Sequence, residues 1–261
     1  SKGIINQVSE VYRKIRNTCR FILGNINDLD VDNLTTYNQL LEIDKWALIK
    51  LNNLIKVCTE AYDAYDFNKA YQAINNFCVV QMSNFYLDII KDRLYTAKPD
   101  SIERRAAQTT MYKTLDALVK ILAPMTCFTA EEIWKYMPHS ASEKQESVML
   151  TQYPEVNNEY DNKELEEKWN KIIKLKDIVS KKLEEARAEK IIGHSLNAKV
   201  TIYANANDYE FLKNNQELLM TVFIISDLQL EKSDEEMKVE VEQAEGQKCE
   251  RCWMYSKTVG Q

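Results

Sequence analysis

Glycine, proline and histidine are scarce in this chain of 261 residues, which has five glycines, four prolines and two histidines. The glycines stand singly, so no glycine-rich loop is present to cradle a phosphate. Neither His139 nor His194 has a serine or cysteine nucleophile arranged beside it together with an acid. The sequence therefore argues against a P-loop nucleotide site and a hydrolytic triad, and the H-E-x-x-H zinc motif is missing as well.

Long hydrophobic runs are also missing. No apolar stretch approaches the roughly 20 residues that a membrane span needs, and the first residues lack the pattern of a signal peptide. Six cysteines are too few for a disulfide scaffold in a chain of this size. We expect a cytoplasmic protein with no membrane partner, in which four cysteines act as small core residues: Cys19, Cys58, Cys78 and Cys127.

The net charge of −6 argues by itself against a nucleic-acid partner, but the charge is uneven. Residues 1–123 carry 16 Lys and Arg against 14 Asp and Glu, whereas residues 124–261 carry 18 against 26. Six of the eight arginines lie in the first part. Arginine binds phosphate with two donors and stacks on bases, so RNA binding is expected there and not in the acidic part.

Helical periodicity dominates the first 138 residues. Apolar residues from Ile5 to Ile22 recur at steps of three and four, and the same spacing returns over 35–63 and in one long helix from Phe67 to Ile89. A further helix is predicted from a capping box at Asp100 to Pro124, and a short one over about 130–137 with Phe128 as a hydrophobic staple. Consecutive helices with short connections predict a bundle over residues 1–138.

The helical periodicity of the sequence is interrupted after residue 138. Residues 139–162 are polar and aperiodic and predict a linker. A helix is expected over about 163–191, followed by strands around Val200, in TVFIISDLQLE and around Val239. We therefore predict a mainly α protein with a small α+β domain at 163–245, and a separate cysteine-bearing segment at 246–261.

The opening helix carries a cationic row beside its apolar face. The row contains no acid at the spacing that would neutralise Arg16 or Arg20, so anion binding and a solvated charged face are both open interpretations. Its members are Arg13, Arg16, Asn17 and Arg20.

A second cationic group surrounds the turn at Pro99. It consists of Arg93, Tyr95, Arg104 and Arg105. An internal salt bridge from Arg93 to Asp88 or Asp92 is the alternative to a ligand contact there.

Cys249 and Cys252 form a C-x-x-C near the end of the sequence. Three interpretations are open: a redox pair, two unrelated thiols, or half of a four-thiolate zinc site. No helix is expected after the pair, which disfavours the redox interpretation.

Six stretches closely resemble the C-terminal region of bacterial-type isoleucyl-tRNA synthetases, in family order. They are YRKIRNTCRFILGN (12–25), YDFNKAYQAINNFCVVQMSNFYLDIIKDRLY (65–95), RRAAQTTMYKTLDALVKILAP (104–124), FTAEEIWKYMP (128–138), EEARAEKIIGHSLNAKV (184–200) and GQKCERCWMYS (246–256). The related valyl and leucyl enzymes look different at the first stretch and lack the last. The class I signature motifs do not occur here, so catalytic and editing domains are expected to precede Ser1.

The resemblance implies a helical anticodon-binding domain, a small junction domain and a truncated zinc knuckle that hold the anticodon stem and loop of tRNA(Ile). It implies an intact enzyme that is monomeric and joins isoleucine to tRNA(Ile) with ATP and Mg, whereas this chain alone is non-catalytic. In the family a second C-x-x-C follows the first, so Cys249 and Cys252 are expected to supply half of a zinc site. Both cationic groups become candidate tRNA-binding residues.

Two other classes of function remain open. A helical protein-interaction scaffold would show a large exposed apolar patch where the resemblance predicts a cationic groove. A redox protein would use Cys249 and Cys252 and would lower the pKa of a thiol.

Overall fold

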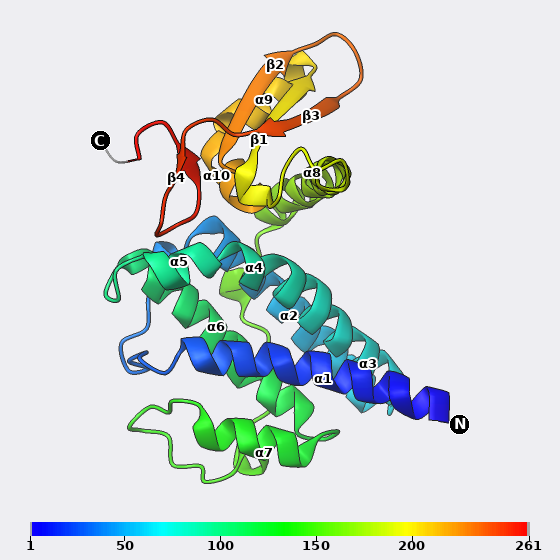
Figure 1. Cartoon of the computed structure of the whole chain (residues 1–261). Helices are drawn as coiled ribbons and strands as arrows, with labels where there is room; N and C mark the ends of the chain where they lie inside the picture. Colours follow the sequence, from blue (N-terminus) through cyan, green and yellow to red (C-terminus); the bar gives the residue numbers. More distant parts are fainter. Residues whose placement is uncertain (1, 260–261) are drawn as a thin grey trace. The chain divides into compact units, whose positions relative to one another are not determined.

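The computed structural model describes residues 2–259 and divides the chain into two compact units, with the boundary between Glu166 and Glu167. The chain is mainly helical, with a small sheet in the second unit (Figure 1). The predicted fold class is confirmed. No helix in the described part of the chain is both long and apolar enough to cross a membrane.

The first unit is a helical bundle. Its longer elements are α1 (Lys2–Asn25), α2 (Glu42–Asp63), α3 (Phe67–Asn76), α6 (Ile102–Leu122) and α7 (Cys127–Tyr136), and its shorter ones are η1 (Tyr37–Gln39), η2 (Phe77–Tyr86), α4 (Leu87–Ile89), α5 (Lys91–Thr96), η3 (Val148–Leu150) and η4 (Asn158–Tyr160). In Figure 1, α1 runs across one face of the bundle, with α3 and α4 on one side and α7 on the other.

The apolar face of α1 is buried only in its C-terminal half. Ile15, Cys19 and Ile22 are buried as the periodicity predicts, whereas Ile5 and Val8, on the same predicted face, are 65% and 51% exposed. The exposed part borders an apolar groove of about 370 Å³, which also reaches α3, α6 and the start of α7.

The predicted helix over Phe67–Ile89 is one helical run with a change of winding. Its middle part, η2, is a π-helix that packs against α1. Thr18 of α1 is buried there, and its hydroxyl lies 3.2 Å from the Cys78 carbonyl and 2.8 Å from the Ser83 hydroxyl. One hydroxyl of α1 therefore contacts both a backbone carbonyl and a side-chain hydroxyl of the π-helix.

Two helix starts differ from the prediction. Helix α6 is capped by Ser101, whose hydroxyl accepts the Arg104 N–H at 3.3 Å, so the cap lies one residue after Asp100. Helix α7 begins at Cys127, and Phe128 is 89% exposed, so it is not a hydrophobic staple.

The predicted core cysteines are confirmed at Cys19, Cys58 and Cys78, which are buried. The prediction is wrong for Cys127, which is exposed at the start of α7, three residues before Ala130, the first buried residue of that helix.

The polar segment 139–162 belongs to the first unit and packs against its helices. Val148 and Tyr160 are buried. The Asn52 amide donates to the Asn157 carbonyl at 2.7 Å and accepts the Asn157 N–H at 3.1 Å. The exact domain boundaries given by the sequence stay a prediction.

The second unit combines most of α8 (Lys163–Ala188) with a three-stranded sheet. The central strand β1 (Ala198–Ala204) pairs in parallel with β2 (Asp227–Lys232) and antiparallel with β3 (Lys238–Gln243). The short helix η5 (Ser195–Asn197) precedes β1, and α9 (Ala206–Asn214) and α10 (Gln216–Phe223) connect β1 to β2. The predicted strand TVFIISDLQLE therefore begins too early, because Thr221, Val222 and Phe223 end α10.

Candidate nucleic-acid interface

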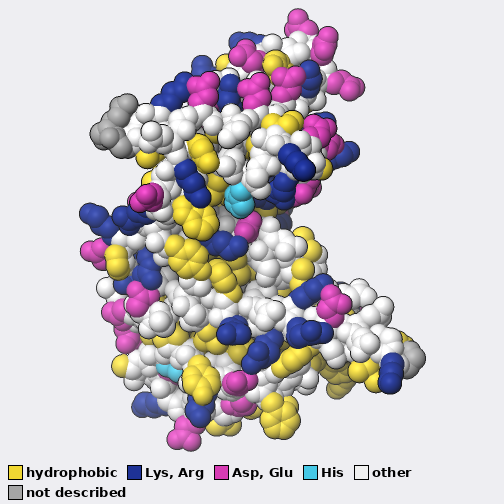
Figure 2. Space-filling model, in the orientation of Figure 1, with side chains coloured by type: hydrophobic (Ala, Val, Ile, Leu, Met, Phe, Trp, Pro, Cys, Tyr) yellow, Lys and Arg dark blue, Asp and Glu magenta, His cyan; other side chains and the backbone are white. Residues whose placement is uncertain are grey.

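The cationic row of α1 faces solvent. Because Ile15, Thr18, Cys19 and Ile22 turn toward the core, the helix presents the opposite side outward. Dark-blue Lys and Arg side chains lie over α1 on the face shown in Figure 2. All four predicted members of the row are exposed: Arg13, Arg16, Asn17 and Arg20.

The three guanidinium groups of this row are not neutralised. Within residues 2–259, no hydrogen bond or ion pair joins Arg13, Arg16 or Arg20 to another side chain, whereas Lys14 of the same helix pairs with Glu10 at 3.3 Å. Unpaired guanidinium groups keep all their donors for a ligand, and a row of them along a helix suits a chain of phosphates.

Arg93 belongs to a buried ion pair and does not join the row. Its two terminal nitrogens donate to the Asp44 carboxylate at 3.0 and 2.5 Å, and the Asp44 side chain is 0% exposed. The Tyr86 hydroxyl also donates to Asp44, at 2.7 Å. Burial and the Asp44 charge raise the pKa of Tyr86, which keeps this phenol protonated. The sequence anticipated a salt bridge for Arg93, but to Asp88 or Asp92.

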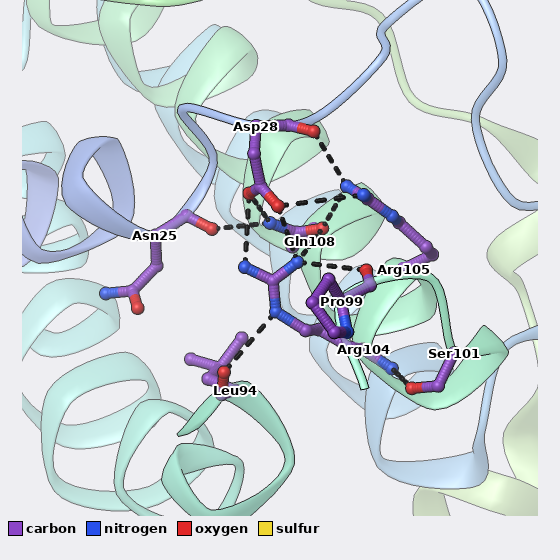
Figure 3. Close-up of polar contacts among 8 residues, drawn as sticks. All are labelled: Asn25, Asp28, Leu94, Pro99, Ser101, Arg104, Arg105 and Gln108. Carbon is purple, nitrogen blue, oxygen red and sulfur yellow. Dashed lines mark hydrogen bonds and ion pairs between the residues drawn. The ribbon is translucent and has the colours of Figure 1, made fainter. Parts of the chain in front are cut away.

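Arg104 and Arg105 are also engaged inside the unit, around Asp28 (Figure 3). Arg104 grips the Asp28 carboxylate with two nitrogens, at 2.7 and 3.1 Å. Arg105 donates to the Asp28 carbonyl and to the Gln108 side chain, both at 2.8 Å. The hydrogen bonds from Arg104 lower the pKa of Asp28 to about 2, with further contributions from Gln108 and the charge of Arg105.

Tyr95 is 63% exposed, so among the four residues predicted around Pro99 it alone presents its side chain mainly to solvent. The sequence brings these four residues together as one cationic patch. The structure instead pairs the three arginines with two acids that were not among the predicted residues: Asp44 binds Arg93, and Asp28 binds both Arg104 and Arg105. The burial of Asp44 could have been predicted from the sequence, because Asp44 lies on the apolar side of α2 between Ile43 and Trp46.

Cys249 and Cys252 lie in a tight turn between the short strands β4 (Gln247–Lys248) and β5 (Tyr255–Ser256). Gly246, with φ of 99°, leads into the hairpin, where an added Cβ would lie 2.4 Å from the Ser256 backbone. The N–H groups of Cys252 and Arg251 bond the Cys249 sulfur and lower the pKa of its thiol.

The two sulfurs suit zinc, which prefers thiolates held by such turns. Among the described residues, however, no group of three or more His, Cys, Asp or Glu could hold a metal ion. Cys249 and Cys252 can therefore supply two of the four ligands that a structural zinc ion needs.

A family profile described as "Anticodon-binding domain of tRNA ligase" matches residues 44–202. This range covers more than half of the sequence, and the chain therefore belongs to this family. A second profile, "Zinc finger found in FPG and IleRS", matches residues 246–261. Helix α1 with its cationic row lies outside both matched ranges.

Similar curated proteins include several isoleucine–tRNA ligases. The one from Caldanaerobacter subterraneus subsp. tengcongensis is 50% identical over 273 residues, which covers 100% of this chain and 29% of that protein. The one from Caldicellulosiruptor saccharolyticus is 52% identical, covering 100% of this chain and 28% of that protein. The one from Moorella thermoacetica is 46% identical, covering 100% and 30%. The chain thus spans under a third of the length of these relatives.

Proposed function

We propose that this chain binds the anticodon stem and loop of tRNA(Ile), and that the cationic row of α1 is the main phosphate-binding surface. The observation that carries the proposal is the row of exposed guanidinium groups without internal partners, on a chain that belongs to a family of tRNA-ligase anticodon-binding domains. Arg13, Arg16 and Arg20 bind phosphate oxygens, and the Asn17 amide bonds a base edge or a ribose hydroxyl.

We propose further that the chain acts within an isoleucine–tRNA ligase, as its relatives are named. That enzyme is cytoplasmic and monomeric, and it attaches isoleucine to tRNA(Ile) with ATP and Mg in regions other than this one. Cys249 and Cys252 contribute two thiolates to a structural zinc site, which would hold the hairpin of β4 and β5 rigid. Tyr95 stays in the proposed interface, whereas the internal bonds of Arg93, Arg104 and Arg105 give these three a structural role.

The test is a titration of the 261-residue chain with tRNA(Ile) and with a copy altered only in the anticodon. Arg16→Ala and Arg20→Ala should each weaken binding of the unaltered tRNA severalfold, because each removes a charge-assisted contact. Lys14→Ala is the matched control on the same helix, since Lys14 is paired with Glu10.

Unaltered affinity in both arginine variants would show that α1 is not the interface. Equal affinity for the two tRNAs would show that the anticodon is not what the chain recognises.

A further inference from the structure

The Arg104 guanidinium joins three segments of the first unit (Figure 3). Besides its two bonds to Asp28, it donates to the Leu94 carbonyl at 3.4 Å and to the Pro99 carbonyl at 3.1 Å. Asp28 lies just after α1, Leu94 lies in α5, and Pro99 lies in the turn before α6. One side chain that is 16% exposed therefore connects the ends of two helices to the start of a third.

This cluster caps the C-terminal ends of two helices. The last four carbonyls of a helix have no partner within it. Leu94 is among the last residues of α5, and Arg104 bonds its carbonyl. Asn25 is the last residue of α1, and its carbonyl accepts the Gln108 amide at 2.8 Å; the same amide donates to Asp28 at 2.6 Å. The end of α1, which carries Arg20, and the end of α5 are thus held by one set of bonds.

Tyr95 follows Leu94 directly and is the exposed aromatic residue at this end of α5. Helix α5 has only six residues, so it depends on outside contacts for its position. The bond from Arg104 to the Leu94 carbonyl supplies such a contact. An exposed ring on a fixed backbone can serve as a platform on which an unpaired base stacks.

We propose that Arg104, with Asp28 and Gln108, positions Tyr95 relative to the α1 arginines, and that the Tyr95 ring stacks on an unpaired base of the RNA whose phosphates α1 binds. This inference rests on the proposed function. Arg104 is a positioning residue in it, because Asp28 neutralises its charge and most of its donors are used inside the protein.

Asp28→Asn separates positioning from direct phosphate binding. If Arg104 positions Tyr95, loss of the Asp28 charge loosens the cluster and weakens RNA binding. If Arg104 binds phosphate, the same substitution frees the guanidinium and removes a negative charge, so it strengthens binding. The two roles predict changes of opposite sign.

The experiment measures the affinity of the full chain for a tRNA(Ile) transcript at several salt concentrations. Tyr95→Ala should weaken binding about tenfold, as loss of one stacked base does, whereas Tyr95→Phe should keep the affinity. Arg104→Lys and Asp28→Asn should weaken binding by similar factors, and the double variant by no more than either. All of these should leave the salt dependence unchanged, because no phosphate contact is lost.

An unchanged affinity of Tyr95→Ala, or tighter binding by Asp28→Asn, overturns the inference. The comparison of Tyr95→Ala with Tyr95→Phe tests whether the Tyr95 ring stacks on a base, even if the cluster variants unfold. Arg16→Ala separates the role of α1 from the role of Tyr95: if Arg16→Ala weakens binding while Tyr95→Ala does not, only the stacking of Tyr95 is ruled out. If neither has an effect, the proposed function fails.

Discussion

Arg93 holds Asp44 through two parallel hydrogen bonds, with the carboxylate fully buried. The remaining acceptor positions of Asp44 are filled by the Tyr86 hydroxyl at 2.7 Å and by the Leu41 N–H at 3.2 Å. A buried charge is tolerated when it is paired and its hydrogen bonds are satisfied, and both conditions hold here. The pair connects α2 to α5 and engages both terminal nitrogens of Arg93.

We predict that Asp44→Asn destabilises the first unit by about 3–5 kcal/mol, because it leaves the Arg93 charge buried without a counter-charge. Urea unfolding measures the loss. The control is Lys91→Ala, which breaks the more exposed pair between Lys91 and Asp88, at 2.8 Å, and should have little effect. Similar small changes in both variants would contradict the prediction.

The α1 row should set the salt dependence of tRNA binding. Each phosphate neutralised adds about 0.7–0.9 to the slope of log affinity against log salt concentration. Arg13→Ala, Arg16→Ala and Arg20→Ala should each reduce this slope by about one unit, and Lys14→Ala should not. Titrations at several salt concentrations measure it, and an unchanged slope in the arginine variants would place the phosphate contacts elsewhere.

Asp28 should stabilise the fold in a pH-dependent way. Its pKa in the folded protein is about 2, below the ordinary value of 3.8, so its ion pairs stabilise the fold fully above the ordinary pKa and lose that effect as the pH falls toward 2. Asp28→Asn should therefore lower the melting temperature at neutral pH, and the difference from the unaltered chain should shrink as the pH falls from 3.8 through about 2. A difference that stays undiminished over this range would show that charge is not the cause.

The six cysteines should divide into two classes of reactivity. Cys19, Cys58 and Cys78 are buried, and burial raises the pKa of Cys19 to about 12, so all three should react with a thiol reagent only on unfolding. The other three are accessible: Cys127, Cys249 and Cys252.

Excess zinc should slow the reaction of Cys249 and Cys252 and leave Cys127 unaffected, because only the first two lie in one turn. Mass spectrometry of the labelled peptides measures each site. Equal protection of Cys127 would indicate nonspecific metal binding.

Much of the bundle could be predicted from residue spacing. The steps of three and four that contain Ile15, Cys19 and Ile22 place these residues on one face of α1, and they are buried. Spacing alone does not predict burial where no partner covers the face: Ile5 and Val8 follow the same pattern but are exposed, and Val8 lines an open groove. The π-helix at Phe77–Tyr86 was also missed, because its apolar pattern is close to that of an α-helix.

The helical architecture and the cationic row of α1 can be read from the amino-acid sequence alone, because both follow from periodicity within one helix. Which arginines keep their donors available depends on the packing of the helices. Arg93 meets an acid 49 positions away and Arg104 an acid 76 positions away. Such pairs depend on how separate helices pack, since a charge is neutralised by what lies near it in space and not by its neighbours along the chain.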